Sequence, residues 1–288
     1  MAVARLAELS HAPEMRKSLE LLFPASRLDA FALSTGLDLR AAPVAAAAGF
    51  DLGTLFLAET PWENAVIEER FTARVTSPPH VDTSARRVRR ISGTMGPTPE
   101  TLVRADRRFV AVAVGDPTLA RIVELYAEGR LGRSPPALKG SALSTLPVEL
   151  ARAPIRFYAP GPFSGEWARG AGGLLGVTLA MGVGAYSEGD TLRIVAVLSG
   201  RWNGTDIDQL EAAWNDLAIS SMGRLLGLDQ PATPAEVSVT DDQLTLRVRL
   251  ARLPLVTGLR AAVAADVWEF LKVPNTDKIA PPVPSAAP

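Results

Sequence analysis

The sequence predicts an α+β protein, in which one or two antiparallel sheets are built from β-hairpins and helices pack on these sheets. Two observations support this class. Pairs of segments with a period of two in their hydrophobicity are joined by turn residues, and segments with an apolar helical stripe follow them. In addition, 47% of the residues are hydrophobic and 21% are charged, as is typical of a globular protein with a large core.

The N-terminal part is rich in alanine and is predicted to be mainly helical. The expected helices are residues 15–23, 26–36 and 42–50. Pro24 stops the first helix, Gly36 ends the second and Gly49 ends the third. Residues 53–59, with the sequence GTLFLAE, are the first expected strand.

From residue 68 onward, the order of two strands followed by a helix recurs, which suggests repeated ββα units. The expected strands are residues 68–76, 86–93, 177–186 and 191–200, together with hairpins over 100–115 and 235–251. The expected helices are residues 116–129, 206–224 and 253–271. Asp116 can cap the first of these helices, whose buried stripe is expected to consist of Leu119, Ile122, Val123 and Tyr126. The third helix is expected to bury Val256, Leu259, Val263, Val267 and Phe270.

The stretch GAGGLLGVTLAMGVGAYS, residues 170–187, contains six glycines and no charged residue. A membrane-spanning helix needs about 17–25 apolar residues, and charged residues flank this stretch closely. A dinucleotide-binding loop would need glycine where Leu175 stands. A strand fits better, because large residues alternate with small ones from Val177 onward and residues 191–198 can return as its partner.

One side of this glycine-rich strand carries almost no side chains and therefore needs a close neighbour. The expected neighbour is a helix, either residues 206–224 or residues 259–267, and a ligand is the alternative. The partner strand is apolar on both faces, so the hairpin is expected to lie in the interior of its sheet.

Two prolines, Pro147 and Pro154, interrupt the pattern of strands and helices near the middle of the chain. We therefore expect an N-terminal α+β half over residues 1–150 and a C-terminal α+β half over residues 151–272. Residues 273–288 are rich in proline and alanine and are expected to form an extended tail.

The composition excludes several kinds of chemistry. There is no cysteine, which excludes disulfides, thiolate metal sites and cysteine nucleophiles. His11 and His80 have no companion at metal-ligand spacing, so we predict no metal site, no cofactor and no catalytic residue. The net charge of −1 gives no field that attracts nucleic acid, and the arginine-rich segment 84–93 is expected to be a solvated sheet edge.

Two tryptophan-bearing loops flank the glycine-rich hairpin and are the expected binding site. Tryptophan and arginine are common in binding hot spots, and glycine frees the backbone of both loops. The candidate binding residues are Phe163, Glu166, Trp167, Arg169, Arg201, Trp202 and Asn203. In the alternative interpretation, the tryptophans close the ends of the core and the arginines cover them.

These features favour a non-enzymatic binding or scaffold protein of a bacterial cell envelope, with a protein or a small ligand as its partner. Only four of the basic residues are lysines, which is typical of GC-rich bacterial genomes. The expected location is the periplasm or the cell envelope, with the cytoplasm as the alternative, and no transmembrane span is expected. Two other functions stay open: an enzyme with a carboxylate and arginine site beside the glycine-rich hairpin, and a subunit of a larger assembly.

Overall fold

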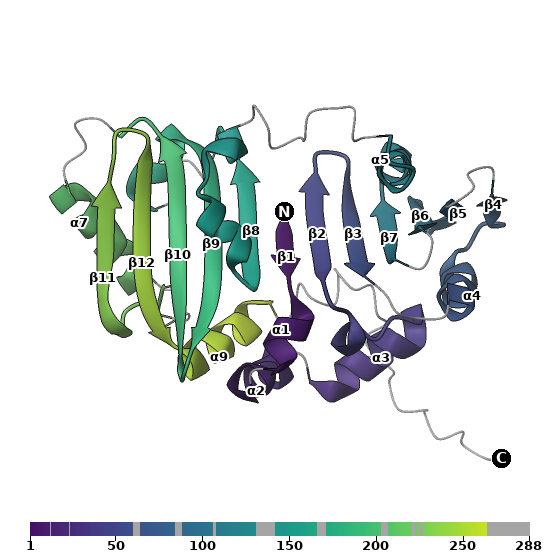
Figure 1. The fold of residues 1–288 in the computed structure, drawn as a ribbon, viewed down its shortest axis with the longest axis horizontal. Coiled ribbons are helices and arrows are strands. Elements are labelled where there is room, and N and C mark those ends of the chain that lie inside the picture. The colour runs from purple at the N-terminus through teal and green to yellow at the C-terminus, as the bar shows by residue number, and fades with distance from the viewer. Residues whose placement is uncertain are drawn as a thin grey trace, which may run out of the picture.

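The computed structural model contains an antiparallel sheet of 12 strands with helices packed on it (Figure 1). The α+β class expected from the sequence is therefore confirmed. The structure describes residues 1–11, 13–22, 24–59, 64–83, 88–105, 108–130, 142–165, 171–202, 207–220, 223–224 and 227–263. No helix among these residues is both long and apolar enough to span a membrane.

The strands lie in the order β11-β12-β10-β9-β8-β1-β2-β3-β7-β6-β5-β4. Their bounds are β1 (Ala2–Ala4), β2 (Ala45–Phe50), β3 (Gly53–Glu59), β4 (His80–Asp82), β5 (Val88–Met95), β6 (Thr98–Ala105), β7 (Phe109–Val114), β8 (Ile155–Pro160), β9 (Thr178–Glu188), β10 (Thr191–Gly200), β11 (Pro231–Val239) and β12 (Gln243–Ala251). The α-helices are α1 (Leu6–His11), α2 (Pro13–Leu22), α3 (Ala25–Thr35), α4 (Asn64–Arg74), α5 (Pro117–Ala127), α7 (Ile207–Ile219) and α9 (Arg252–Val263). The short 3-10 segments are η1 (Leu39–Ala41), η3 (Ala142–Thr145), η4 (Val148–Arg152) and η5 (Ala171–Val177).

The short strand β1 joins the two parts of the sheet. It pairs with β2 on one side and with β8 on the other, through three residue pairs each. Strands β2 to β7 lie on one side of β1, and β8 to β12 lie on the other (Figure 1). The first residues of the chain therefore make one continuous sheet out of two consecutive stretches of sequence.

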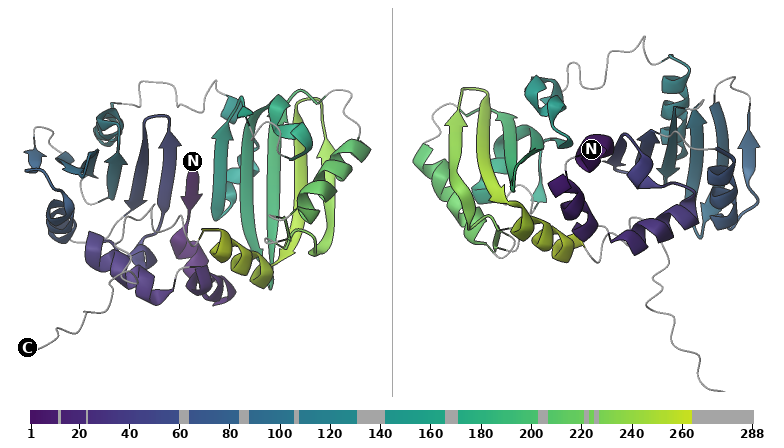
Figure 2. Two further views of the ribbon diagram at one scale, coloured as in Figure 1. Left: turned by 180° about the vertical axis from the view of Figure 1, so that it is seen from behind. Right: turned by 60° about the horizontal axis from the view of Figure 1, so that its bottom comes forward.

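The two faces of the sheet are covered differently. The helix-bearing face carries Phe56, Phe157 and Ile194, and the α-helices other than α5 pack on it (Figure 2). The opposite face carries Arg156 and Arg193; α5 packs on one end of it, and η3 and η4 pack on the other. Each face thus has its own apolar clusters, and the sheet forms the layer between them.

The glycine-rich stretch is extended over β9, which pairs with β10 across a turn at Gly189. The prediction that a helix at residues 206–224 or 259–267 packs on its glycine side is wrong. The segments η3 and η4 cover that side, and α7 lies on the other face. A Cβ atom added at Gly182 would lie 2.5 Å from Leu150 Cδ1 and 3.1 Å from Leu146 Cδ1. One at Gly184 would lie 3.0 Å from the Cβ of Ala153. Glycine therefore permits close packing of a 3-10 segment on the strand.

The helix expected at residues 42–50 is wrong. Residues Ala45–Phe50 form β2, and Gly53–Glu59 is therefore not the first strand. Alanine has the highest intrinsic helix propensity, so the local signal favours a helix. However, β1 and β3 offer hydrogen-bonding partners on both sides of this segment, and this pairing overrides the propensity.

The strand expected at residues 68–76 is also wrong, because Asn64–Arg74 is the helix α4. Ile67 and Phe71 are buried, and with Val75 they pack in one cluster under α3 and α4. These three residues are spaced by four, which places them on one side of a helix. The expected strand began at residue 68 and therefore left out the first member of this helical pattern.

The buried stripe of α5 differs from the expected one at two positions. Asp116 caps the helix as expected, since its carboxylate accepts the Thr118 N–H at 2.8 Å. Ile122 and Tyr126, however, are 47% and 64% exposed. The buried face consists of Leu119, Ala120, Val123 and Glu124. A buried glutamate on this face indicates a polar partner on the sheet.

Candidate functional site

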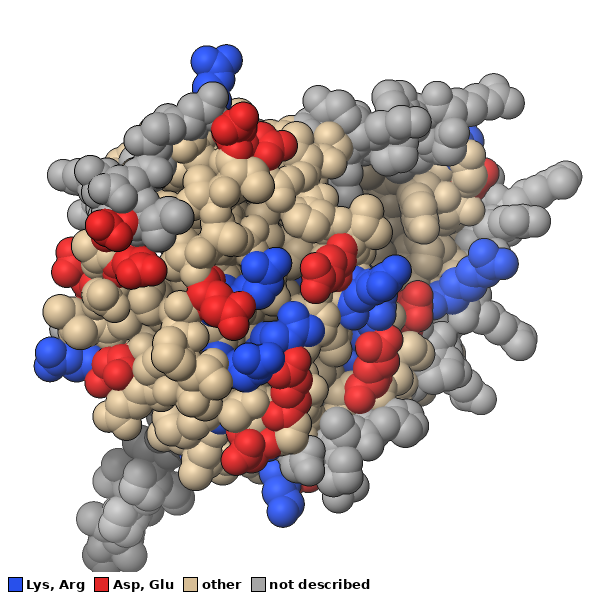
Figure 3. All heavy atoms as spheres, turned by 60° about the vertical axis from the view of Figure 1, so that its left-hand side comes forward, with Lys and Arg blue, Asp and Glu red and all other residues tan. Residues whose placement is uncertain are grey.

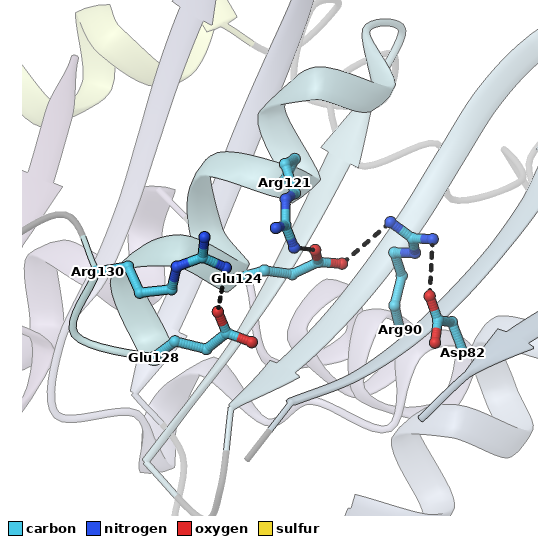
Figure 4. A network of polar contacts seen from close by, with 6 residues as sticks. All are labelled: Asp82, Arg90, Arg121, Glu124, Glu128 and Arg130. Carbon is cyan, nitrogen blue, oxygen red and sulfur yellow. Dashed lines mark hydrogen bonds and ion pairs between the residues drawn. The ribbon is translucent and has the colours of Figure 1, made fainter. Parts of the chain in front are cut away.

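A charged cleft lies where α5 meets β4 and β5 on the opposite face of the sheet (Figure 4). Its volume is about 400 Å³. The lining residues are Asp82, Val88, Arg90, Arg121, Glu124, Glu128 and Arg130. Apart from Val88 they are all charged, with equal numbers of basic and acidic side chains. We call this site the α5 cleft.

Glu124 is the central residue of the α5 cleft. Its side chain is only 7% exposed, and its two oxygens lie 2.8 Å from Arg121 Nη1 and 3.1 Å from Arg90 Nη1. Arg121 comes from the same helix, three residues earlier, whereas Arg90 comes from β5. A carboxylate near the C-terminal end of a helix is disfavoured by the helix dipole, and these two guanidinium groups offset that cost.

Arg90 links Glu124 to the edge of the sheet. Its Nη2 donates to Asp82 Oδ2 at 3.0 Å, so one guanidinium group binds carboxylates from α5 and β4 (Figure 4). Arg89, the preceding residue, points to the other face, where its Nε lies 2.8 Å from Glu68 Oε2 on α4. The solvated edge expected for this segment is therefore wrong for these two arginines. Through these ion pairs, Arg89 holds α4 and Arg90 holds α5 against β5, each on its own face of the sheet.

The mouth of the α5 cleft carries groups that are open to solvent. Arg130 Nη1 lies 3.3 Å from Glu128 Oε2, and the Arg130 side chain is 61% exposed. The side chain of Arg121 is 50% exposed. The cleft therefore combines a buried carboxylate with accessible guanidinium groups, which can form bidentate hydrogen bonds to an acidic group.

The structure describes three of the seven residues predicted to bind: Phe163, Arg201 and Trp202. Trp202 is 2% exposed and donates its Nε1–H to the Leu198 carbonyl at 3.1 Å, in a core cluster with partly buried Phe163. Arg201 is exposed. The remaining predicted residues, Glu166, Trp167, Arg169 and Asn203, lie outside the described residues. Among the described residues, Trp202 thus has the position of a core cap.

Sequence reasoning missed the α5 cleft, although two signals were present. Arg121 and Glu124 are three residues apart on a helix, which is the spacing of an ion pair. Arg89 and Arg90 are adjacent on a strand and so must face opposite sides of the sheet. The sequence alone does not show that the helix residue Glu124 pairs with the strand residue Arg90, 34 positions earlier in the chain.

A second charged cluster lies beside the β9–β10 turn, on the same face of the sheet as the α5 cleft. Glu188 accepts from Arg193 Nε at 2.5 Å and from Arg249 Nε at 3.0 Å. The Arg193 guanidinium also lies 4.1 Å from the ring centroid of Tyr186. Figure 3 shows basic and acidic side chains mixed on the surface of this C-terminal part of the molecule. In the part of the chain that the structure describes, no three His, Asp or Glu side chains are grouped as metal ligands would be.

The hydrogen bonds from Arg193 and Arg249 lower the pKa of Glu188 below its ordinary value. A lowered pKa in the folded state stabilises the protein above the pKa of the unfolded chain, about 4.3, and this contribution is lost as the pH falls through the folded value. We expect Glu188→Gln to reduce the free energy of unfolding at pH 7 by about 0.5–1 kcal/mol. The difference from the parent protein should vanish in urea titrations at acidic pH and shrink in 1 M salt. A difference that persists unchanged at low pH would contradict this assignment.

Comparison with known proteins bears on the fold. No family model and no curated protein matches the chain. A solved structure, crystal form III of TP0453, matches with a TM-score of 0.50 and 10% sequence identity, over 90% of this chain and 93% of that one. This chain is similar in fold to TP0453. Crystal form I of TP0453 matches with a TM-score of 0.49 and 10% identity, over 90% of this chain and 92% of that one. The likeness extends through nearly the whole of both chains.

Proposed function

We propose that this protein is a non-enzymatic binding protein of a bacterial cell envelope, and that it holds a protein or small ligand in the α5 cleft. The observation that carries the proposal is the buried carboxylate of Glu124 at the base of an open cleft of about 400 Å³. A buried charge with two arginine partners is a preorganised polar site, and such sites suit recognition of charged groups.

The charges of the α5 cleft define the kind of ligand. Its basic and acidic groups balance, so a ligand with a single charge gains little from the cleft as a whole. A partner that presents an acidic and a basic group together could bind the exposed Arg121 and the partly exposed Glu128 at the same time. Arg130, which is 61% exposed, adds a further guanidinium donor at the mouth of the cleft. These groups support recognition of a mixed-charge surface.

The enzyme alternative would use the Glu188 cluster, which lies beside the glycine-rich hairpin as that hypothesis requires. Its carboxylate is held ionised, because two arginine hydrogen bonds lower its pKa. An ionised carboxylate cannot donate a proton, and general acid catalysis near neutral pH needs a raised pKa instead. This direction of the shift favours binding over acid catalysis.

Two finer points of organisation are part of the proposal. The orders β9–β10–α7 and β11–β12–α9 support two ββα units that repeat in the C-terminal half. A division into residues 1–150, residues 151–272 and a tail over residues 273–288 remains our proposed domain organisation. Location in the periplasm or envelope can be tested by fractionating cells that produce the protein with its natural N-terminal region.

Charge reversal at the mouth of the α5 cleft tests the proposed function. We expect Arg121→Glu to abolish capture of the partner from bacterial envelope extracts at physiological salt, because it places an acidic group where the acidic group of the mixed-charge partner binds. Arg70→Glu is the matched control, since Arg70 is an exposed arginine on α4, on the other face of the sheet. Capture by the parent protein should also weaken in 0.5 M salt.

The result is read by mass spectrometry of the captured proteins and by calorimetry with the strongest hit. A partner that the parent and Arg70→Glu retain, and that Arg121→Glu loses, supports the α5 cleft as the binding site. Equal capture by all three proteins overturns it. Circular dichroism of the Arg121→Glu variant controls for loss of the fold.

A further inference from the structure

An apolar row crosses the helix-bearing face through every strand of the sheet. Following the register from one edge to the other, its members are Val81, Ile91, Leu102, Val112, Phe56, Ala47, Ala2, Phe157, Val183, Ala196, Leu246 and Val237. Directly opposed residues in neighbouring strands share one face of a sheet, so these side chains form a continuous band. A band of this kind requires a cover.

The described helices cover the two flanks of the band and leave its middle open. Ile91 and Leu102 are each 2% exposed beneath α3 and α4. In the middle, Phe157 on β8 is 41% exposed, and Leu179 on β9, which lies on the same face, is 50% exposed. Ala2 on β1, directly opposite Phe157 on the same face, is also exposed. We call this exposed area, over β9, β8 and β1, the open apolar area.

The open apolar area differs sharply in charge from the other side of the same strands. On the helix-bearing face, strands β1, β2, β8 and β9 carry no charged residue. On the opposite face, Arg156 and Arg193 stand on β8 and β10. Sheets that face water on one side carry polar residues there. The apolar side is therefore built to be covered.

We propose that residues 264–271 of this same chain, with the sequence AADVWEFL, dock on the open apolar area. The place where α9 ends supports this assignment. Leu255 and Leu259 of α9 pack in one cluster with Ala4 of β1 and Ile155 of β8, the strands that form the open apolar area. α9 runs from the end of β12 toward α1, beneath these strands (Figures 1 and 2). The chain beyond Val263 thus starts at the border of that area.

The length and chemistry of residues 264–271 fit the area. The strand from Ile155 to Pro160 is about 17 Å long, and eight residues span about 12 Å as a helix or about 26 Å when extended. Four of the eight residues are large and apolar: Val267, Trp268, Phe270 and Leu271. The alanines of β1 and β2 leave a shallow floor beside Phe157, and aromatic side chains fill such space well.

The absence of cysteine allows a direct test by disulfide trapping. In the full-length chain, Phe157→Cys is combined with Phe270→Cys, and mild oxidation should join them in one chain. The matched control is Arg156→Cys with Phe270→Cys, because Arg156 is the next residue and lies on the opposite face. We expect the first pair to form its intramolecular disulfide about tenfold faster, since two sulfurs bond only at short range. Equal rates for the two pairs would overturn the proposal.

A second measurement does not depend on Phe157. A single Leu179→Cys should react slowly with a maleimide in the full-length chain, and about tenfold faster when Phe270→Asp and Leu271→Asp are added, because the cover then opens. An unchanged rate would contradict docking. A disulfide of Phe157→Cys that forms between chains, with a dimer in gel filtration, would show instead that a second copy covers the area and would also overturn the proposal.

Discussion

Gly182→Val is expected to reduce the free energy of unfolding by about 1–3 kcal/mol. The first atom of the new side chain would lie 2.5 Å from Leu150 Cδ1 and 3.1 Å from Leu146 Cδ1, so these two packed leucine side chains must shift. Valine is otherwise favourable in a strand, which isolates the packing effect. Gly49→Val is the matched control, because Gly49 is also in a strand and nothing lies within 4 Å of its added Cβ. Urea unfolding of both variants measures the difference.

A double-mutant cycle tests whether Leu150 is the residue that excludes a side chain at position 182. Leu150 is 1% exposed, and Leu150→Ala alone should cost about 2–5 kcal/mol through the cavity it leaves. In the double variant, the valine fills part of that cavity, so the combined cost should be smaller than the sum. Additive costs would show that the two positions do not press on each other.

Glu124→Gln is expected to have the second large effect, about 1–3 kcal/mol of lost unfolding free energy. The substitution keeps the shape of the side chain but replaces the carboxylate that Arg90 and Arg121 share with a neutral amide. Arg90 is 29% exposed, so water compensates in part, and the cost stays below that of a fully buried pair.

The control for Glu124 is Glu128→Gln in the same cleft. Its partner Arg130 is 61% exposed, and exposed ion pairs contribute little, so the cost should be under about 0.5 kcal/mol. Thermal unfolding of the two variants under identical conditions gives the comparison. If the two substitutions cost the same, Glu124 does not organise the α5 cleft.

The sequence predicts the fold class and many elements because hydrophobic periodicity is a local signal. The large and small residues of β9 alternate, and Asp116 with Pro117 marks the start of α5; the structure agrees with both. Local sequence signals fail where pairing with distant strands determines the conformation of a segment. Ala45–Phe50 is a strand because β1 and β3 pair with it, and no residue within that segment encodes those partners.

The candidate site was harder to predict than the fold, for a physical reason. A cleft consists of groups that meet only after the chain has folded, and Arg90 and Glu124 meet only because α5 packs on β5. Two tryptophan-bearing loops stand out in the sequence, and of their two tryptophans the structure describes Trp202, which is buried in a core cluster. The charged residues of α5 show no motif in the sequence. They form a cleft only together with the charged residues of the strands on which α5 packs.

Strand β1 has a mechanical consequence for the whole molecule. The wide sheet is continuous only through a bridge of three residues, whereas β10 holds β9 and β12 along almost its entire length. When two well-paired parts of a sheet are joined by so short a strand, bending and twisting concentrate at that strand and each part keeps its own shape. Small rotations of one part relative to the other would then change the width of the open apolar area. The short strand β1 therefore sets how closely a segment docked on that area is held.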